Sequence, residues 1–271
     1  MNYRKISPPQ ELRNYIRYFW VLESDGPDPG RTSFRTIADG CPGIVFYQSD
    51  NGAFFRDDKQ LPGIFLYGQA SIHSDIHAPC QLSAIGVYFY PNALQTVFGF
   101  NAVELTDSCI DLNETHSARL FSLKEQLLNV LSAEEKIRIL SSYLISLICN
   151  KDIYTDPIAQ HVLSRIVSSH GSISLKELHK SVSLSERTFE RRFRQSIGIS
   201  PKLFSRICRF QASLNQLRNN DYQKLSDLAF QHDYADQSHH IRDFKEFAGC
   251  SPYQFQKQLN ELVENFPKLK K

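Results

Sequence analysis

The alternation of hydrophobic and polar positions divides the chain into two parts. From Asn2 to Asp111, short apolar or aromatic runs such as GIVFYQ, GIFLYGQ and LSAIGVYFYP are separated by turn-rich breaks. Runs of this length and composition are typical of antiparallel strands in a sandwich or barrel. Beyond that point, apolar residues recur every three or four positions, as on one face of a helix. The pattern predicts an α+β chain with two domains, β-rich first and helical afterwards.

The breaks between the apolar runs locate the turns. They are DGPDPG (25–30), DGCPG (39–43), SDNG (49–52) and LPG (61–63). SDNG predicts a hairpin, since Asn-Gly suits a turn with positive φ at both central residues. Two segments favour short helices within the β-rich part: residues 10–19, with apolar residues on one face, and Asn92–Phe98, after a proline.

Two amphipathic helices are predicted between the halves. The first, Ala118–Leu131, carries a stripe of leucines, and the second opens at Ser132, where Glu135 completes a capping box. Together they form a helical hairpin over residues 113–152, which either packs against the β-rich domain (residues 1–112) or provides a dimer surface. Residues 150–157 then predict a linker that ends in a helix start at Asp156-Pro157.

The C-terminal segment, residues 157–260, predicts a helix-turn-helix unit. After a helix over 158–169, a short helix (174–180) and a tight turn lead to a helix capped by Ser185. Phe189 and Phe193 fall on its inner face. The opposite face carries polar and basic residues at i, i+3, i+4 and i+7: Arg187, Glu190, Arg191 and Arg194. A short helix followed by a helix with a basic outer face is typical of DNA recognition.

The same pattern occurs a second time, 51 residues later. The shift aligns equivalent residues in the two copies: Arg191 with Arg242, Phe193 with Phe244, Gly198 with Gly249, Ser200-Pro201 with Ser251-Pro252, and Phe204 with Phe255. A repeat of this kind indicates two copies of one structural unit. The second recognition helix is predicted over 237–247, with Ser238, His239, Ile241, Arg242 and Lys245 on its outer face.

A helix from Ser200 to about Asn219 is predicted to separate the two units. It would be roughly 27–30 Å long, at 1.5 Å per residue. A rigid spacer of that length could hold two recognition helices about one DNA turn (~34 Å) apart, in successive major grooves. One chain would then contact an asymmetric site on double-stranded DNA.

Composition and charge agree with this prediction. The net charge is +2, but residues 1–160 carry 13 Lys/Arg and 18 Asp/Glu, giving −5, and residues 161–271 carry 18 and 11, giving +7. The basic half is the half with the repeat, as expected for nucleic-acid binding.

The sequence has no apolar run of the roughly 20 residues that span a membrane, and no secretory signal at its start. We therefore expect a cytoplasmic protein. Its six cysteines lack a C-x-x-C pair, so we expect reduced thiols.

Residues from about 158 to 258 resemble the AraC/XylS family of bacterial transcription regulators. The most specific stretch is 225–255, LSDLAFQHDYADQSHHIRDFKEFAGCSPYQF. It resembles the family's leucine-alanine helix, an aromatic residue after the turn, an Arg-x-Phe-Lys core and a Gly-x-Ser/Thr-Pro ending. The N-terminal stretches PPQELRNYIRYFWVLES, IADGCPG, IGVYFYPNALQTVFGF and LTDSCIDL resemble one subgroup.

The resemblance implies a cupin-like β-rich domain, for effector sensing or dimerisation, joined to a double helix-turn-helix DNA-binding domain. It implies a homodimer that acts with RNA polymerase, and neither an enzyme nor a protein with a cofactor or metal. Carried over by motif, Arg187, Glu190 and Arg191 contact base edges from the first helix. Ser238, His239 and Arg242 do so from the second. Arg194 and Lys245 lie further along their helices and contact phosphates.

Four positions depart from the family pattern. Ser183 and Asp233 replace the glycine that is usual in each helix-turn-helix turn. Aspartate tolerates the left-handed conformation, so we expect the second turn to be preserved and the first to have a different geometry. His179 and His240 stand where a small or apolar residue is usual, which predicts looser packing in both units.

Alternative functions remain open at this point. His73, His77, Cys80 and Asp75 could form a metal cluster, although His-x-x-x-His has ligand spacing only on a helix. A small apolar effector could bind between strands that carry Phe46, Tyr47, Phe65, Tyr67, Tyr88 and Tyr90, of which adjacent residues point to opposite faces. Otherwise the first half only dimerises. A non-specific architectural DNA-binding protein is disfavoured, because shape-only binding does not require Arg, Ser and His placed towards the bases.

Overall fold

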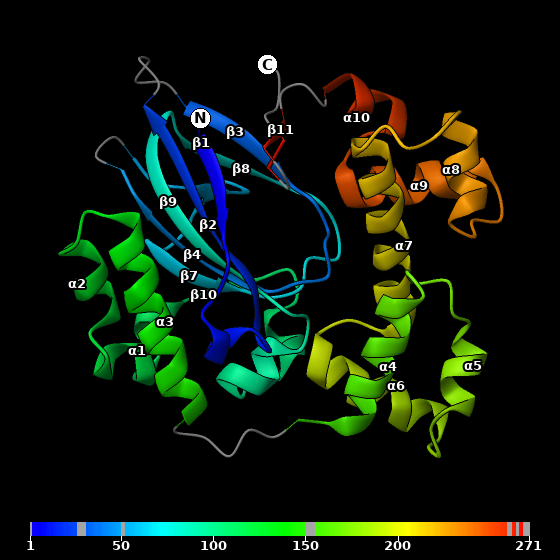
Figure 1. Cartoon of the computed structure of the whole chain (residues 1–271), viewed down its shortest axis with the longest axis horizontal. Coiled ribbons are helices and arrows are strands. Elements are labelled where there is room, and N and C mark those ends of the chain that lie inside the picture. The colour runs from blue at the N-terminus through cyan, green and yellow to red at the C-terminus, as the bar shows by residue number, and fades with distance from the viewer. Residues whose placement is uncertain are drawn as a thin grey trace.

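The computed structural model describes residues 2–25, 31–49, 52–149, 155–258, 262–263 and 266–267. A β-sandwich lies at the centre, with helices α1 to α3 on one side of it and helices α4 to α10 on the other (Figure 1). The predicted α+β fold, with a β-rich N-terminal part and an all-helical C-terminal part, is confirmed. Two short strands, β11 (Leu262–Val263) and β12 (Phe266–Pro267), pair with each other after the last helix.

The larger sheet has six antiparallel strands in the order β1-β2-β9-β4-β7-β10. These strands are β1 (Asn2–Ile6), β2 (Ile16–Asp25), β4 (Gly43–Gln48), β7 (Ile64–Tyr67), β9 (Gln81–Phe89) and β10 (Cys109–Asp111). Both faces of its central strands are buried. This explains why β4 and β7 are nearly continuous apolar runs and do not alternate with polar residues.

The smaller sheet has four antiparallel strands in the order β3-β8-β5-β6. They are β3 (Arg31–Thr36), β8 (Ser74–Pro79), β5 (Phe55–Arg56) and β6 (Lys59–Gln60). Its inner face packs on the larger sheet, where Phe34 and Ala78 join Trp20, Val45 and Phe65 in one buried cluster.

Helices α1 (His116–Leu120), α2 (Leu123–Leu128) and α3 (Ala133–Cys149) cover the outer face of the larger sheet. Leu140 and Leu144 of α3 share a core with residues of β2, β4 and β9 such as Phe19, Ile44 and Val87. The N–H of Glu135 donates to Ser132 Oγ at the predicted start of α3. The packing role of the helical hairpin is thus confirmed, and a dimer surface stays a prediction.

The prediction of one continuous helix over 118–131 is wrong. Ser122 has a φ of 51°, which separates α1 from α2 and rotates their apolar faces relative to each other. Leu123 and Leu127 are fully buried, whereas Leu120 and Leu131 are 75% and 95% exposed. The leucine stripe therefore divides into a buried pair and an exposed set.

The short helix predicted at 10–19 is also wrong beyond its first turn. A 3₁₀ turn covers Gln10–Leu12, and strand β2 begins at Ile16. The backbone N–H and C=O groups of β2 form hydrogen bonds with β1 on one side and β9 on the other. These strand pairings are long-range, so the hydrophobic pattern within residues 10–19 could not predict them.

The helix predicted near Pro91 is present as a π-helical turn, Leu94–Phe98, followed by 3₁₀ turns at Ala102–Leu105 and Leu112–Glu114. Two expected breaks, the centre of the SDNG turn (50–51) and most of the linker (150–154), lie outside the described residues, as does most of DGPDPG.

Between residues 157 and 258, all the regular elements are helices. They are α4 (Pro157–Ser168), α5 (Leu175–Lys180), α6 (Glu186–Ile197), α7 (Pro201–Arg218), α8 (Leu225–Gln231), α9 (Gln237–Ala248) and α10 (Pro252–Gln258). The predicted caps at Asp156 and Ser185 each accept a hydrogen bond from a backbone N–H in the first turn of their helix, and so does Ser174, which was expected inside the short helix and instead caps it. Such caps satisfy N–H groups that the helix itself leaves without partners.

The 51-residue repeat corresponds to repeated packing. Phe193 of α6 contacts Phe204 of α7 edge to face, with ring centroids 5.9 Å apart. The equivalent pair, Phe244 of α9 and Phe255 of α10, makes the same contact at 5.6 Å. Both recognition helices end at a glycine with positive φ, as the repeat requires.

The departures from the family pattern have mixed outcomes. Asp233 has a φ of 53°, so the predicted left-handed turn of the second unit is confirmed, and Ser183 is not among the residues with positive φ. His240 is buried between aromatic rings and lies 3.2 Å from Ser213 Oγ, so looser packing there is wrong. His179 contacts Phe189 edge to face, but its buried Nε2 lacks a hydrogen-bond partner among the described residues.

Candidate nucleic-acid interface and effector pocket

The first recognition helix, α6, presents one continuous polar face. Its inner residues Phe189 and Phe193 are 3% and 1% exposed. On the opposite face the structure brings together four exposed side chains: Arg187, Glu190, Arg191 and Arg194. Three arginines and one glutamate offer the donors and the acceptor that major-groove base edges and phosphates require.

The second recognition helix, α9, presents a different surface. Of the residues predicted on its outer face, Ser238, His239, Arg242 and Lys245 are exposed and Ile241 is partly exposed. Asp236 caps this helix by accepting the N–H of His239, a bond of 2.8 Å. That hydrogen bond, together with the nearby His239 and Arg242, lowers the pKa of Asp236. The two helices therefore have equivalent backbones but different recognition chemistry, with only the arginine at 191 and 242 in common.

Helix α7 connects the two units. It has 18 residues, which corresponds to about 27 Å. Figure 1 shows α7 as a column with α8 to α10 at one end and α4 to α6 at the other.

Two ion-pair networks hold the recognition helices against their neighbours. Arg192 of α6 binds Asp156, the cap of α4, with two hydrogen bonds of 2.7 and 2.9 Å. Arg206 of α7 binds both Asp243 and Glu246 of α9, each at 2.6 Å. Sequence reasoning missed both arginines. The i, i+3 spacing of the two acidic residues on α9 was the available signal.

The first recognition helix borders the sandwich. It packs against the π-helical turn and the 3₁₀ turn Ala102–Leu105. Val103 and the outer face of α6 form the walls of one shallow groove. Thr106 Oγ1 donates to the carbonyl of Gly198, where α6 ends, over 2.9 Å.

The second recognition helix is held by the sandwich at its C-terminal end. The N–H groups of Ala38 and His73 donate to the carbonyls of Phe247 and Glu246, over 3.1 and 3.3 Å. Arg35 donates to the carbonyl of Gly249. Ile37 and Ala38 belong to the same buried cluster as the helical core. The segment IADGCPG thus extends from the sandwich into the DNA-binding part.

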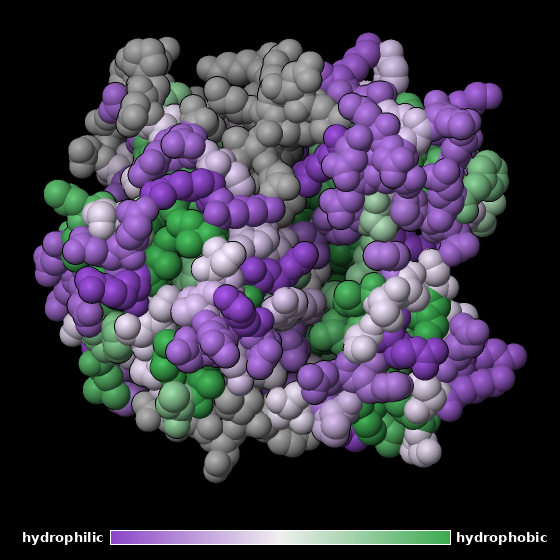
Figure 2. Space-filling model, in the orientation of Figure 1, coloured by the Kyte–Doolittle hydropathy of each residue, from purple (hydrophilic) through white to green (hydrophobic). Residues whose placement is uncertain are grey.

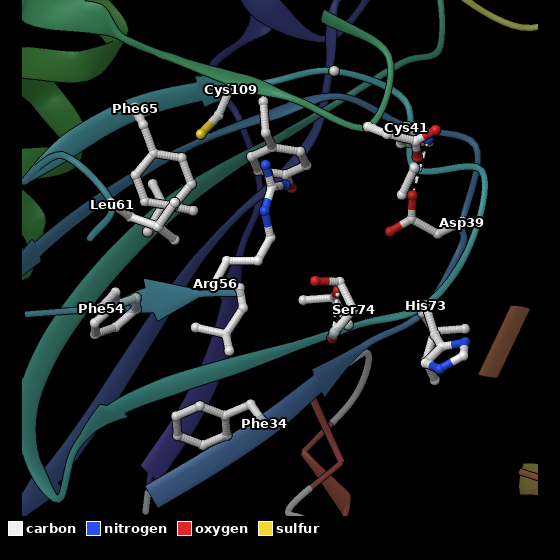
Figure 3. A pocket seen from close by; sticks show the side chains of 18 of the residues that line it. Phe34, Asp39, Cys41, Phe54, Arg56, Leu61, Phe65, His73, Ser74 and Cys109 are labelled. Carbon is white, nitrogen blue, oxygen red and sulfur yellow. Dashed lines mark hydrogen bonds between the residues drawn. The ribbon is translucent and has the colours of Figure 1, made fainter. Parts of the chain in front are cut away.

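A cavity of about 450 Å³ lies between the two sheets. This volume is within the ~300–1,000 Å³ range of small-molecule sites. Its lining is mostly apolar and aromatic, and includes Trp20. Figure 3 shows Phe34, Phe54, Leu61 and Phe65 of this lining.

Of the six aromatic residues considered from the sequence, Phe65, Tyr67 and Tyr88 line the cavity. Phe46 faces the helix-covered side of the sheet, and Tyr47 stacks on Phe54. Tyr90 is 40% exposed. Alternation along β4 explains why Phe46 faces away from the cavity, whereas Tyr47 belongs to the same inner cluster as Phe65 and Tyr88, and Tyr90 lies beyond the end of β9.

The wall of the cavity nearest α9 contains a partly buried acid. Asp39 accepts the N–H of Cys41 over 2.9 Å and also bonds Tyr88. Burial raises the pKa of Asp39 to about 6, because water no longer solvates its charged form. Burial also raises the pKa of the Cys41 thiol to about 12, so this cysteine is unreactive.

The histidines considered as metal ligands have other partners. Asp75 pairs with Arg35 at 2.7 Å, His77 Nδ1 contacts Ser33 Oγ at 2.7 Å, and His73 Nδ1 contacts the Glu246 carbonyl at 3.0 Å. Within the described ranges, no group of three or more His, Cys, Asp or Glu side chains could hold a metal ion. None of the helices described has the length and apolarity needed to cross a membrane.

Two helix-turn-helix units on one helical domain, joined to a β-sandwich, define a DNA-binding transcription regulator. Residues 178–258 match the model of a helix-turn-helix domain, and residues 4–111 match a domain of unknown function, DUF6597. The C-terminal region is a helix-turn-helix domain of the AraC type, which confirms the resemblance drawn from its motifs.

The solved structures to which the chain is similar include ToxT from Vibrio cholerae O395. It has 11% identity and a TM-score of 0.48, over 96% of this chain and 99% of that one. ToxT from V. cholerae strain SCE256 with a bound unsaturated fatty acid has 12% identity and a TM-score of 0.47, over 92% and 96%. No curated protein matches the sequence.

Proposed function

We propose that the protein binds a specific asymmetric DNA site, with α6 and α9 in successive major grooves. The observation that carries this proposal is the pair of equivalent recognition helices with exposed polar outer faces, joined by α7. A separation close to one turn of DNA (~34 Å) is compatible with a connecting helix of about 27 Å plus the width of the units it joins.

The roles of the exposed residues follow from their chemistry and position. Arg187, Glu190 and Arg191 contact base edges from α6, and Ser238, His239 and Arg242 do so from α9. The arginines can pair with both major-groove acceptors of guanine. Arg194 and Lys245, one turn further along, contact phosphates. RNA polymerase is the further partner of such a regulator.

The chain is divided into three functional segments. Residues 1–112 form the sensor domain, 113–152 the helical hairpin, and 157–260 the DNA-binding domain. A small molecule in the cavity controls DNA binding. Supporting this, the cavity lining includes Ile37, Asp39 and His73, which belong to the two segments that contact the end of α9. A ligand that moves these segments changes the position of the second recognition helix.

Selection of bound sequences from random DNA tests the DNA proposal. The selected site should contain two different half-sites about ten base pairs apart. Arg191→Ala and Arg242→Ala should each cost about 1–3 kcal/mol on that site and relax the preference at one position, in different half-sites. Equal weakening on random DNA would show that the arginine contacts the backbone only.

A second candidate function for the N-terminal half is dimerisation without a ligand. The exposed leucines of the helical hairpin favour it: Leu120, Leu128 and Leu131 are 75%, 47% and 95% exposed. Apolar side chains are visible at the margin where α2 lies, whereas the surface over α8 to α10 is largely hydrophilic (Figure 2). Sedimentation of the wild type and of a Leu120→Glu/Leu131→Glu variant tests the dimer. Loss of the dimer in the variant places the dimer surface on the hairpin.

A further inference from the structure

Arg56 occupies an unusual position in the sandwich. It lies on β5, opposite Ile76 of β8, and its side chain extends into the middle of the cavity towards Cys109 (Figure 3). Burial raises the pKa of the Cys109 thiol, and the charge of Arg56 partly offsets this increase. A guanidinium therefore stands between two sheets whose facing side chains are otherwise mainly apolar.

Within the described part of the chain, Arg56 has no hydrogen bond and no ion pair. Of the four aspartates in the cavity wall, Asp57 is exposed and forms no ion pair with Arg56 in the described part of the chain, and the other three have other partners. Asp75 pairs with Arg35, and Asp107 accepts both the N–H and the hydroxyl of Ser71. Asp39 is bonded to Cys41 and Tyr88. Arginine stays protonated in proteins, and an unpaired charge against an apolar wall is costly. A ligand with an anionic group would supply the partner that the Arg56 guanidinium lacks.

Two further polar atoms of the cavity lining lack partners among the described residues. Gln69 is fully buried, and its Oε1 accepts no hydrogen bond although its Nε2 donates to the Pro91 carbonyl. The buried hydroxyl oxygen of Ser74 is also without a partner. Buried polar atoms are almost always hydrogen-bonded, so both atoms indicate positions for polar groups of a ligand.

We propose that the cavity binds a compact organic anion whose apolar body packs among Phe34, Phe54 and Phe65 and whose anionic group pairs with Arg56. This inference rests on the proposed function, because it takes the cavity to be the effector site, and it adds the chemical class of the effector. Arg56 supplies charge-assisted hydrogen bonds, and the aromatic side chains supply the apolar contact.

A matched pair of fluorescent probes tests the inference on the full-length protein. 8-Anilinonaphthalene-1-sulfonate and N-phenyl-1-naphthylamine differ by the sulfonate alone. Trp20 is the single tryptophan of the chain and lines the cavity, so quenching of its emission by either probe reports binding at this site. The anionic probe should bind about 10- to 100-fold more tightly than the neutral one, as expected for a hydrogen-bonded charge pair.

Two variants locate the origin of that preference. Arg56→Met should remove it and leave binding of the neutral probe unchanged. Lys59→Gln should retain it, since Lys59 is an exposed cation of the same hairpin that does not line the cavity. The ligand-free Arg56→Met protein should melt at an unchanged or higher temperature, because an unpaired charge has been removed from an apolar site. A purely structural arginine would instead lower the melting temperature.

The outcomes separate the two proposals. If both probes quench Trp20 equally, the anionic class is wrong. If Arg56→Met keeps the preference, Arg56 is not the partner of the anionic group and the inference is overturned at that residue. In both cases the cavity remains a candidate effector site. If neither probe quenches Trp20 in the wild type, both the inference and the effector role of the cavity fail. The DNA-selection experiment is independent of either result.

Discussion

The backbone N–H of His73 donates to the carbonyl of Glu246, 3.3 Å away, and His73 Nδ1 lies 3.0 Å from the same oxygen. His73 borders the cavity of the sandwich, and Glu246 is in the last turn of the second recognition helix. The two parts of the chain thus meet through a carbonyl of α9 itself. A displacement of the segment before β8 is transmitted to α9 without an intervening flexible side chain.

Gly249 should be sensitive to substitution because it lies at this contact. Its φ is +73°, and a Cβ there would lie 2.6 Å from His73 Cδ2 and 2.8 Å from an Arg35 nitrogen. Gly249→Ala should lower the free energy of unfolding by about 1–3 kcal/mol, mainly through left-handed strain. Urea denaturation measures this. Gly63→Ala is the control, since nothing lies within 4 Å of its Cβ position. Equal stability of both variants would contradict the contact.

The Arg206 network should stabilise the DNA-binding part. Arg206 pairs with Asp243, whose side chain is only 8% exposed, and stacks over the Phe247 ring at 5.0 Å. Arg206→Met leaves a nearly buried carboxylate unpaired and should cost about 3–5 kcal/mol in the free energy of unfolding. The exposed pair Arg138–Glu135, at 3.9 Å, provides the comparison. Arg138→Met should cost less than about 0.5 kcal/mol, and similar losses for both would refute the prediction.

His240 should make the protein acid-sensitive. Burial lowers its pKa to about 4, and His232 adds to the effect. The imidazole is neutral in both folded and unfolded chains above its unfolded pKa of about 6.5. As the pH falls from about 6.5 to 4, the unfolded chain binds a proton that the folded chain excludes, so stability is lost in that window, by up to about 3 kcal/mol.

The pH effect can be assigned by substitution. His240→Phe keeps an aromatic ring beside Tyr234 and Phe244 but cannot be protonated, so its unfolding free energy should decrease less between pH 7 and 4.5 than that of the wild type. His239→Gln, at an exposed position, should follow the wild type. Parallel curves for wild type and His240→Phe would show that other groups cause the acid sensitivity.

Arg194 and Arg191 should differ in how they depend on salt and sequence. Both are exposed on α6, but Arg194 lies nearly one turn further along. Arg194→Ala should weaken binding about equally on all sequences and reduce the slope of log K against log[salt] by about 1, the signature of a lost phosphate contact. Arg191→Ala should affect the selected site most. Titrations at four salt concentrations on selected and random DNA compare the two, and identical slopes for wild type and Arg194→Ala would exclude the phosphate role.

Local signals in the sequence were sufficient for the helical half. A cap depends on one side chain and the next three backbone N–H groups, so Asp156 and Ser185 could be placed from sequence. Phe193 and Phe244 could be assigned to the core from a 3.6-residue period. The burial of the leucines in α1 and α2 could not be predicted in this way. The left-handed conformation of Ser122 interrupts the helical period, and a serine gives no sequence signal for that conformation.

The sequence by itself determined the two recognition helices, their exposed faces and the β-rich character of the first half, because these depend on periodicity, capping and a repeated motif. Only the tertiary structure decided that Ile37 and Ala38 enter the helical core and that Arg56 faces a cavity. An apolar run such as AFFRD does not reveal which face of a strand meets which sheet. That depends on the pairing of β5 with β8 and on the packing of the two sheets, which bring together residues far apart in the chain.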